Sequence, residues 1–272
     1  MIQALHTGGM GLLANQFRLD VIANNFANVN TNGYKSSRAD FKDALYQTMQ
    51  RPMQPQDELN LELGHGVLVS ATTRVLKQGA LLETGRATDF GLNGEGFFAV
   101  RDAEGNTLYT RDGNFHISHE RDGDYLVTHD GMYVLDIEGR AVMMPPDTSN
   151  FTVSSDGTIS EVYGHRIVQL DSEAEDDRYV PPEELGKLGI YQFPTAEGLA
   201  AAGGNCFAET DNSGGAARAL NTEVRQGYVE ASTTDIANEM TQMILAQRAY
   251  QFSARVVSTA DQMEGVANSL RK

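Results

Sequence analysis

The residues of this sequence with the clearest potential to bind a metal ion are two histidines, His116 and His119. They lie in a segment with the alternating pattern of a β-strand, and residues three apart on a strand point to opposite faces. A shared metal ion is therefore not expected. The acidic run from Asp171 to Asp177 could attract calcium, but it lacks the glycine and the ligand spacing of an EF-hand loop, so we expect a solvated loop.

Nucleophilic and nucleotide chemistry are equally poorly supported. Cys206 is the single cysteine, and its neighbours include no basic side chain that would lower the pKa of the thiol. The glycine-rich stretch 91–96 precedes the apolar run 97–100, which is typical of a strand and not of the helix that a phosphate-binding loop requires. The sequence therefore predicts no catalytic residue, no cofactor and no metal. A pair of carboxylates converging in a cleft, as in a glycan-acting enzyme, remains a distant alternative.

Charge and hydropathy restrict the partners. The formal net charge is -16 over 272 residues, which disfavours binding to nucleic acid or to anionic lipid. No run of about 18 apolar residues is present, so we expect no transmembrane helix. The first 20 residues lack a basic segment followed by a continuous apolar core, so we expect no cleaved signal peptide.

The elements that dominate the chain are two heptad patterns at its ends. Apolar residues repeat every seven positions at Leu5, Leu12, Leu19 and Phe26, and again at Val229, Ile236, Met243, Tyr250 and Val257. This spacing predicts amphipathic helices over residues 4–29 and 233–270. Gly8, Gly9 and Gly11 weaken the first helix or allow close packing, and Ser232 is the expected N-cap of the second.

Between the helices the pattern changes to short alternating runs separated by turns such as Asp112-Gly113 and Asp156-Gly157. Such turns between alternating strands predict an antiparallel β-domain over residues 67–224. Residues 34–50 could form a short helix or an extended arm, and residues 51–66 a loop or hairpin insert.

Two terminal helices of this kind need a partner. Burial of a large apolar side chain contributes about 1.5–3 kcal/mol, whereas ordering each backbone residue costs about 1–2 kcal/mol. If only one row of apolar side chains is available for burial, its burial free energy does not offset the cost of ordering some 25 residues. We therefore expect the helices to be partly disordered in the monomer and to fold on assembly; a self-contained helical hairpin is the alternative.

Four strings in the chain resemble the bacterial flagellar rod, hook and hook-associated axial proteins. The first is DVIANNFANVNTNGYK (20–35), the second GEGFFAV (94–100), the third YTRDGNF (109–115), and the fourth a closing helix with Gln247-Arg248-Ala249-Tyr250 at its centre. The family pattern falls on Asn24, Asn25, Asn28, Thr31, Gly33, Tyr34 and Lys35.

The resemblance implies a structural subunit of the flagellar basal-body rod, not an enzyme. Such subunits leave the cell unfolded through the flagellar export apparatus and stack helically with copies of themselves and with other rod and hook subunits; basal-body bushing rings are a further implied partner. The location implied is the basal body in the cell envelope. A distal rod subunit is favoured, with a proximal rod or hook-type subunit, a glycan-acting enzyme and a monomeric adhesion module as alternatives.

The predicted fold class is α+β, with a mainly antiparallel central β-domain and terminal helices that pair as a coiled coil. Residues 1–33 and 226–272 form the helical inner core, residues 34–75 a connecting arm with a short insert, and residues 76–225 an outer β-domain. The residues predicted for the assembly interface are Leu5, Leu12, Leu19, Ile22, Asn24, Asn25, Phe26, Asn28, Gly33, Ile236, Met243, Gln247, Arg248, Tyr250 and Val257.

Overall fold

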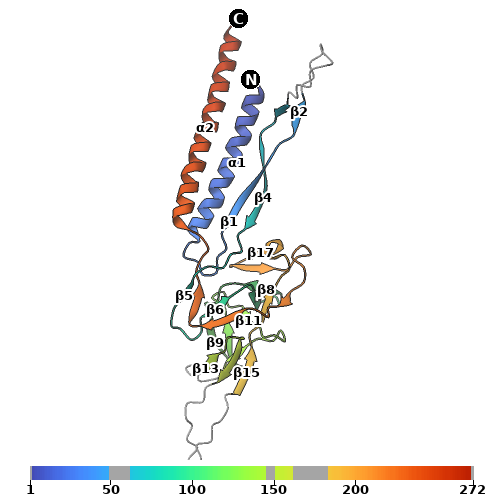
Figure 1. Cartoon of the computed structure of the whole chain (residues 1–272), viewed down its shortest axis with the longest axis vertical. Coiled ribbons are helices and arrows are strands. Elements are labelled where there is room, and N and C mark those ends of the chain that lie inside the picture. Colours follow the sequence, from blue (N-terminus) through green and yellow to red (C-terminus); the bar gives the residue numbers. More distant parts are fainter. Residues whose placement is uncertain (1, 49–61, 145–150, 162–182, 271–272) are drawn as a thin grey trace, which may run out of the picture. The chain divides into compact units, whose positions relative to one another are not determined.

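The computed structural model describes residues 2–48, 62–144, 151–161 and 183–270. The chain forms two compact units, which alternate along the sequence (Figure 1). Unit 1 comprises Met1–Val29, Ser36–Val75 and Thr234–Lys272, and unit 2 comprises Asn30–Lys35 and Leu76–Thr233. Most of the predicted insert and the acidic run from Asp171 to Asp177 lie outside the described residues.

Unit 1 contains the two terminal helices, α1 (Ile2–Ala27) and α2 (Ile236–Ser269). They lie side by side and antiparallel, so the N-terminus of α1 and the C-terminus of α2 are at the same end of the pair (Figure 1). Their bounds agree within three residues with those predicted from the heptad patterns. The predicted α+β class, with terminal helices and an antiparallel β-region between them, is confirmed.

The predicted N-cap of the second helix was wrong. Asp235, not Ser232, caps α2, and its side chain accepts hydrogen bonds from the backbone N–H groups of Ala237 and Asn238 at 3.0 and 3.4 Å. A carboxylate here satisfies two free N–H groups and complements the positive end of the helix dipole. Residues 231–235 lie outside the helix, and the backbone N–H of Thr233 donates to the carbonyl of Tyr34.

The remainder of unit 1 is an extended arm. Strand β1 (Ser37–Asp43) pairs antiparallel with β4 (Val67–Arg74), with a bulge between Asp40 and Phe41, and β2 (Tyr46–Thr48) pairs with β3 (Glu62–Gly64). The arm therefore forms by strand pairing, and residues 34–48, the described part of the segment 34–50, contain no helix. The β1–β4 ladder lies against α1, where Gly66 approaches Thr7 and Met10.

Unit 2 is built from antiparallel sheets. Among the described residues, its largest sheet has ten strands: β7 (Phe97–Arg101), β8 (Thr107–Thr110), β9 (His116–Glu120), β10 (Gly123–Val127), β11 (Tyr133–Val134), β12 (Met143–Met144), β16 (Ile190–Gln192), β17 (Ala200–Gly203), β18 (Cys206–Ala208) and β19 (Ala217–Arg218). The smaller sheets are β13 (Phe151–Val153) with β14 (Thr158–Glu161) and β15 (Glu183–Lys187), β20 (Glu223–Gln226) with β6 (Phe90–Asn93), and β21 (Tyr228–Glu230) with β5 (Leu81–Glu83). A 3₁₀ helix (Ala196–Gly198) precedes β17.

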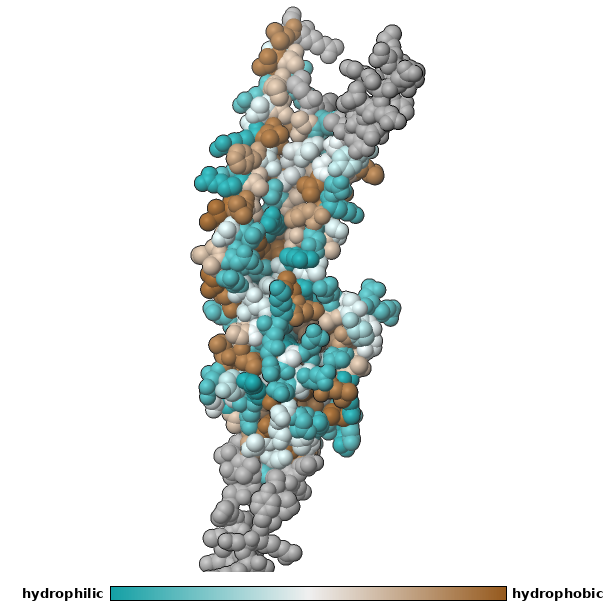
Figure 2. Space-filling model, in the orientation of Figure 1, coloured by the Kyte–Doolittle hydropathy of each residue, from teal (hydrophilic) through white to brown (hydrophobic). Residues whose placement is uncertain are grey.

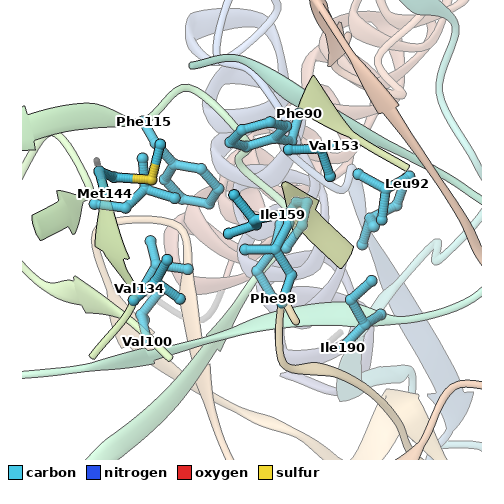
Figure 3. Packing of buried hydrophobic residues seen from close by; sticks show 14 of the residues in the cluster. Phe90, Leu92, Phe98, Val100, Phe115, Val134, Met144, Val153, Ile159 and Ile190 are labelled. Carbon is cyan, nitrogen blue, oxygen red and sulfur yellow. The ribbon is translucent and has the colours of Figure 1, made fainter. Parts of the chain in front are cut away.

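Two apolar clusters stabilise unit 2. The larger cluster gathers Phe90, Phe98, Phe115 and Ile159, each fully buried, from four different segments (Figure 3). The Phe98 and Phe115 rings meet edge to face at 5.2 Å between centroids, an arrangement that favours one specific packing. Contacts between residues so far apart in sequence give unit 2 its own hydrophobic core.

Candidate assembly interface

Two glycines of α1 lie directly against α2 in unit 1. A Cβ atom on Gly8 would lie 2.9 Å from Cγ2 of Val257, and one on Gly11 would lie 3.1 Å from Oγ of Ser253. A Cβ on Gly9 would meet no atom within 4 Å. Gly8 and Gly11 thus permit close packing of α1 against α2, whereas Gly9 lies away from it.

Polar contacts continue along the pair. The Arg18 guanidinium donates to Oε1 of Gln242 at 2.6 Å, and the side-chain amide of Asn25 donates to Oε1 of Glu239 at 3.2 Å. Burial raises the pKa of Glu239 above its ordinary value; the nearby Asp235 adds to this, and the hydrogen bond from Asn25 opposes it. These polar contacts fix the axial register of the helix pair.

Asn25, in the motif shared with flagellar proteins, fastens α1 to the extended arm. It is 1% exposed. Its carboxamide donates to the carbonyl of Ser37 at 2.7 Å and accepts from the N–H of the same residue at 2.8 Å. The side chain therefore pairs with the first residue of β1 as a neighbouring strand would, and both of its polar ends are satisfied.

The end of the same motif lies in unit 2. Gly33 has a φ of +66°, and a Cβ atom on it would lie 2.6 Å from the carbonyl carbon of Arg111. Its N–H donates to the carbonyl of Glu230 at 2.7 Å. Glycine is required here both by the left-handed backbone and by the close approach of another chain segment.

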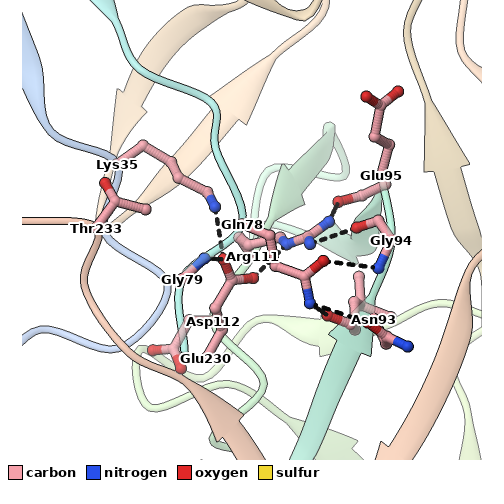
Figure 4. Close-up of polar contacts among 12 residues, drawn as sticks. Lys35, Gln78, Gly79, Asn93, Gly94, Glu95, Arg111, Asp112, Glu230 and Thr233 are labelled. Carbon is pink, nitrogen blue, oxygen red and sulfur yellow. Dashed lines mark hydrogen bonds and ion pairs between the residues drawn. The ribbon is translucent and has the colours of Figure 1, made fainter. Parts of the chain in front are cut away.

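Lys35, Arg111 and Glu230 form a buried ionic cluster in unit 2 (Figure 4). Lys35 Nζ lies 2.6 Å from Glu230 Oε1, and Arg111 Nε lies 2.5 Å from Oε2; the three side chains are 1–5% exposed. The backbone N–H of Gly79 donates to the same carboxylate, and Arg111 also donates to the carbonyls of Gly94 and Gly96. Burial lowers the pKa of Lys35, and the adjacent Glu230 opposes this shift.

The cluster joins segments that adjoin the two helices in sequence. Lys35 follows α1 by eight residues, and Glu230 precedes the N-cap of α2 by five. The backbone bond from Gly33 to Glu230 strengthens the same junction. Unit 2 therefore holds both helix-linking segments together by a satisfied ionic network, in which each polar group has partners.

The predicted interface residues fall into three groups of exposure. Ile22, Asn25 and Gly33 are buried; Leu12, Leu19, Asn28, Met243 and Val257 are half-buried; Leu5, Asn24, Phe26, Ile236, Gln247, Arg248 and Tyr250 are exposed. Within one chain, the structure thus leaves much of the predicted interface accessible.

The histidines and the cysteine that were considered as metal ligands or as a nucleophile lie in different surroundings. His119 lies 2.6 Å from Asp124, whereas the ring of His116 packs 6.1 Å from that of His129. Among the described residues, no three His, Cys, Asp or Glu side chains converge in a group that could hold a metal ion. Burial raises the pKa of the Cys206 thiol to about 11, which disfavours the thiolate.

Across the described ranges of the chain, no helix is long and apolar enough to cross a membrane.

Three family models match the segments just described. The flagella basal body rod protein model matches residues 5–35, the flagellar hook protein FlgE/F/G D1 domain model residues 91–161, and the flagellar basal body rod FlgEFG protein C-terminal model residues 225–270. Helix α1 with its motif, the first half of the β-region and helix α2 all carry the features of the flagellar rod and hook class. The resemblance predicted from the four strings is confirmed.

Full-length relatives narrow this class. The chain is 37% identical to the flagellar basal-body rod protein FlgG of Borreliella burgdorferi, with 100% of both chains covered, and 35% identical to FlgG of Caulobacter vibrioides, covering 99% and 100%. It is 28% identical, over 100% of both chains, to the flagellar hook-basal body complex protein FlhP of Bacillus subtilis. The chain belongs to the FlgG family of flagellar basal-body rod proteins. It is a structural subunit of the bacterial flagellar rod.

Sequence reasoning missed the partners of the motif residues. Asn25 and Lys35 were singled out from the motif, but Ser37, Glu239 and Glu230 were not recognised as the groups that they bind. Glu230 lies in the segment that the C-terminal family model matches. A carboxylate flanked by Val229 and Ala231 was the available signal, because an acid in an apolar setting needs a buried cation.

Proposed function

We propose that this chain assembles helically with copies of itself to form the distal part of the rod, and that the terminal helices make the assembly contacts. Within this proposal, residues 1–33 and 226–272 pack as a coiled coil in the inner core, residues 34–75 form a connecting arm, and residues 76–225 face outward. The rod so formed transmits torque from the motor to the hook.

The observation that carries the proposal is the large apolar area left uncovered on the helices. Leu13 and Phe252 are each 63% exposed, Val266 is 59% exposed and Ile244 is 59% exposed. Figure 2 shows hydrophobic side chains in brown along α2. Large exposed apolar side chains that recur along a helix in this way favour an interaction site in a chain that folds in water.

The form of the contacts follows from the need for a filament. A heterologous contact, in which one surface of a subunit meets a different surface of the next, generates an open helical array when its rotation does not close. A drive shaft requires such an array and no reaction chemistry. Export through the flagellar apparatus and passage through bushing rings are consistent with this role and rest on the family resemblance alone.

Charge insertion in the predicted seams tests the role of the helices. Leu19→Asp on α1 and Tyr250→Asp on α2 place a carboxylate within an apolar contact, and we expect each to abolish rod assembly and motility when it replaces the native chain. The control is Gln251→Asp, an adjacent exposed polar position on α2. Intact rods in electron micrographs of a motile strain that carries Leu19→Asp would refute the proposal.

A further inference from the structure

Helix α2 carries two apolar rows, and the interior of unit 1 uses one of them. The first row alternates spacings of four and three residues and faces α1; it contains Glu239, Met243, Ala246, Tyr250, Ser253, Val257 and Ala260. Ala246 and Ala260 are 1% and 3% exposed, and Ser253 and Val257 meet the glycines of α1. This row is occupied within one chain.

The second row has the same spacing and is largely uncovered; Val256 comes near α1, where a Cβ atom on Gly8 would lie 3.5 Å from its Cγ1. It contains Leu245, Ala249, Phe252, Val256, Thr259, Met263, Val266 and Leu270, again separated by four and three residues in turn. Its large members are exposed by 49–82%. At 3.6 residues per turn the two rows lie about 100° apart around the helix.

The spacing of the second row identifies the shape of its partner. Alternating steps of four and three residues place side chains as knobs that fit the holes of a facing helix, whereas a strand repeats every two residues. Phe252 and Val256 also border a hollow of about 590 Å³ together with Ala4, Thr7 and Gly64. The row therefore presents both protruding side chains and an adjoining space for those of another helix.

Helix α1 has an outward-facing row of residues with the same alternating spacing as the second row of α2. Gly9, Leu13, Gln16, Asp20, Ala23 and Ala27 repeat with steps of four and three residues. Leu13 is 63% exposed, and the small residues in this row permit close approach of another helix. Asp20 is exposed on this row, and Arg248 and Arg255 are exposed beside the second row of α2. In the described part of the chain neither arginine takes part in an ion pair.

We infer that the second row of α2 binds the outward row of α1 from a second copy of this chain. The inference rests on the proposed self-assembly and specifies its contact. Because the two rows differ, the contact is heterologous and can repeat from copy to copy without closing. Pairing of one second row with another would be isologous and would stop at a dimer, which is incompatible with a growing rod.

Cysteine cross-linking of the full-length chain tests the contact. Leu13→Cys is combined in one chain with Leu245→Cys, Phe252→Cys, Val256→Cys or Met263→Cys, so that the axial offset between copies is sampled. Assembled rods are treated with a short bis-maleimide and analysed on a denaturing gel. We expect at least one combination to give a ladder of multimers, each single variant to remain monomeric, and Leu13→Cys with Ser258→Cys, which lies outside both rows, to give no ladder.

Other outcomes separate this contact from the proposed function. Rods that appear intact but give no ladder with any combination would overturn the contact and leave self-assembly standing. Dimers from Val256→Cys alone would also overturn it, because they report pairing of two second rows. Failure of the parent chain to form rods at all would instead refute the proposed function.

A charge exchange gives a second readout. Asp20→Arg places like charges together across the inferred contact, and we expect it to reduce the yield of rods at least several-fold. Combination with Arg248→Asp or Arg255→Asp should restore the yield if the rows meet. Equal yields from Asp20→Arg and the parent chain would contradict the pairing of these rows.

Discussion

Nζ of Lys35 and Oε1 of Glu230 lie 2.6 Å apart, although 195 residues separate them in the sequence. This buried pair links the segment that follows the first helix to the strand that precedes the second. Arg111 adds a second cation on the same carboxylate. The motif lysine that marks this family in sequence is thus part of the junction between the two ends of the chain.

Removal of either charge at this junction should destabilise unit 2, but to different extents. Lys35→Met leaves Glu230 paired with Arg111, and we expect a loss of about 2–3 kcal/mol. Glu230→Gln leaves two buried cations without a counter-ion, and we expect a loss of about 4–5 kcal/mol. Urea denaturation of the full-length monomer, followed by the near-ultraviolet circular dichroism of its tyrosines, measures the difference.

An exposed pair in the same unit serves as the control. Lys187 lies 2.9 Å from Asp156, and their side chains are 41% and 58% exposed. Because water screens this pair, Lys187→Met should cost less than about 1 kcal/mol. If Lys35→Met cost no more than Lys187→Met, the buried cluster would not have the stabilising role that we assign to it.

Substitution of Gly33 can separate the effect of its close contact with the Arg111 backbone from the effect of its left-handed backbone conformation. Gly33→Ala must adopt a φ of +66° and also move the Arg111 backbone, whereas Gly85→Ala must adopt a φ of +70° with no atom within 4 Å of its Cβ. We expect about 1–2 kcal/mol for Gly85→Ala and more than about 3 kcal/mol for Gly33→Ala. Equal losses in denaturation would show that the segment around Arg111 yields freely.

Glu239 should make the stability of the helix pair depend on pH. Its pKa is raised in the folded chain, first by burial, so the folded state holds the proton more tightly than the unfolded state. The stabilising contribution is complete below the ordinary pKa of 4.5 and is lost as the pH rises through the raised pKa. Glu239→Gln keeps an acceptor for Asn25 and removes this loss.

We therefore expect Glu239→Gln to raise the thermal midpoint of the helix signal at pH 8 and to change it less at pH 4.5, the ordinary pKa of this side chain. Far-ultraviolet circular dichroism at the two pH values provides the measurement, with Asp261→Asn, an exposed carboxylate on the same helix, as the control. A midpoint difference that is the same at both pH values would contradict a role for titration of Glu239.

Local patterns in the sequence were sufficient to predict the helices, but not to predict which strands pair with each other. The heptads predict both helices because a helix records its buried face every three to four residues. Phe41, Leu45 and Met49 are compatible with a short helix, yet residues 37–43 are extended because β1 pairs with the distant strand β4. Pairing partners of this kind leave no mark in a local pattern.

In the candidate site, too, the sequence indicates individual residues but not the partners that they bind. Asn25 and Lys35 stand out in the motif, whereas their partners depend on which distant backbone and carboxylate the fold brings near. The cap of α2 was misplaced because Ser232 and Asp235 are both good caps in sequence. In the folded chain residues 231–234 are not helical, and the side chain of Asp235 accepts from the first N–H groups of α2.

The last turns of α2 should gain order when subunits assemble. Gly8 lies opposite Val257, and six residues further in each antiparallel helix lead to Ile2 and Met263. Beyond Met263, α2 has no backbone of α1 beside it, although Val266 and Leu270 are large, exposed and apolar. Since an isolated helical segment of this length is marginal in water, we expect these turns to be poorly ordered in the dilute monomer.

Far-ultraviolet circular dichroism should accordingly show more helix in rods than in the same mass of monomer. Hydrogen exchange localises the gain: backbone amides of residues 264–269 should exchange rapidly in the monomer and slowly in rods, whereas those of unit 2 should be protected similarly in both. Equal helix content and equal protection in the two states would mean that the intrachain pairing of α1 with α2 already orders the whole of α2, and that subunit contacts add no helical structure.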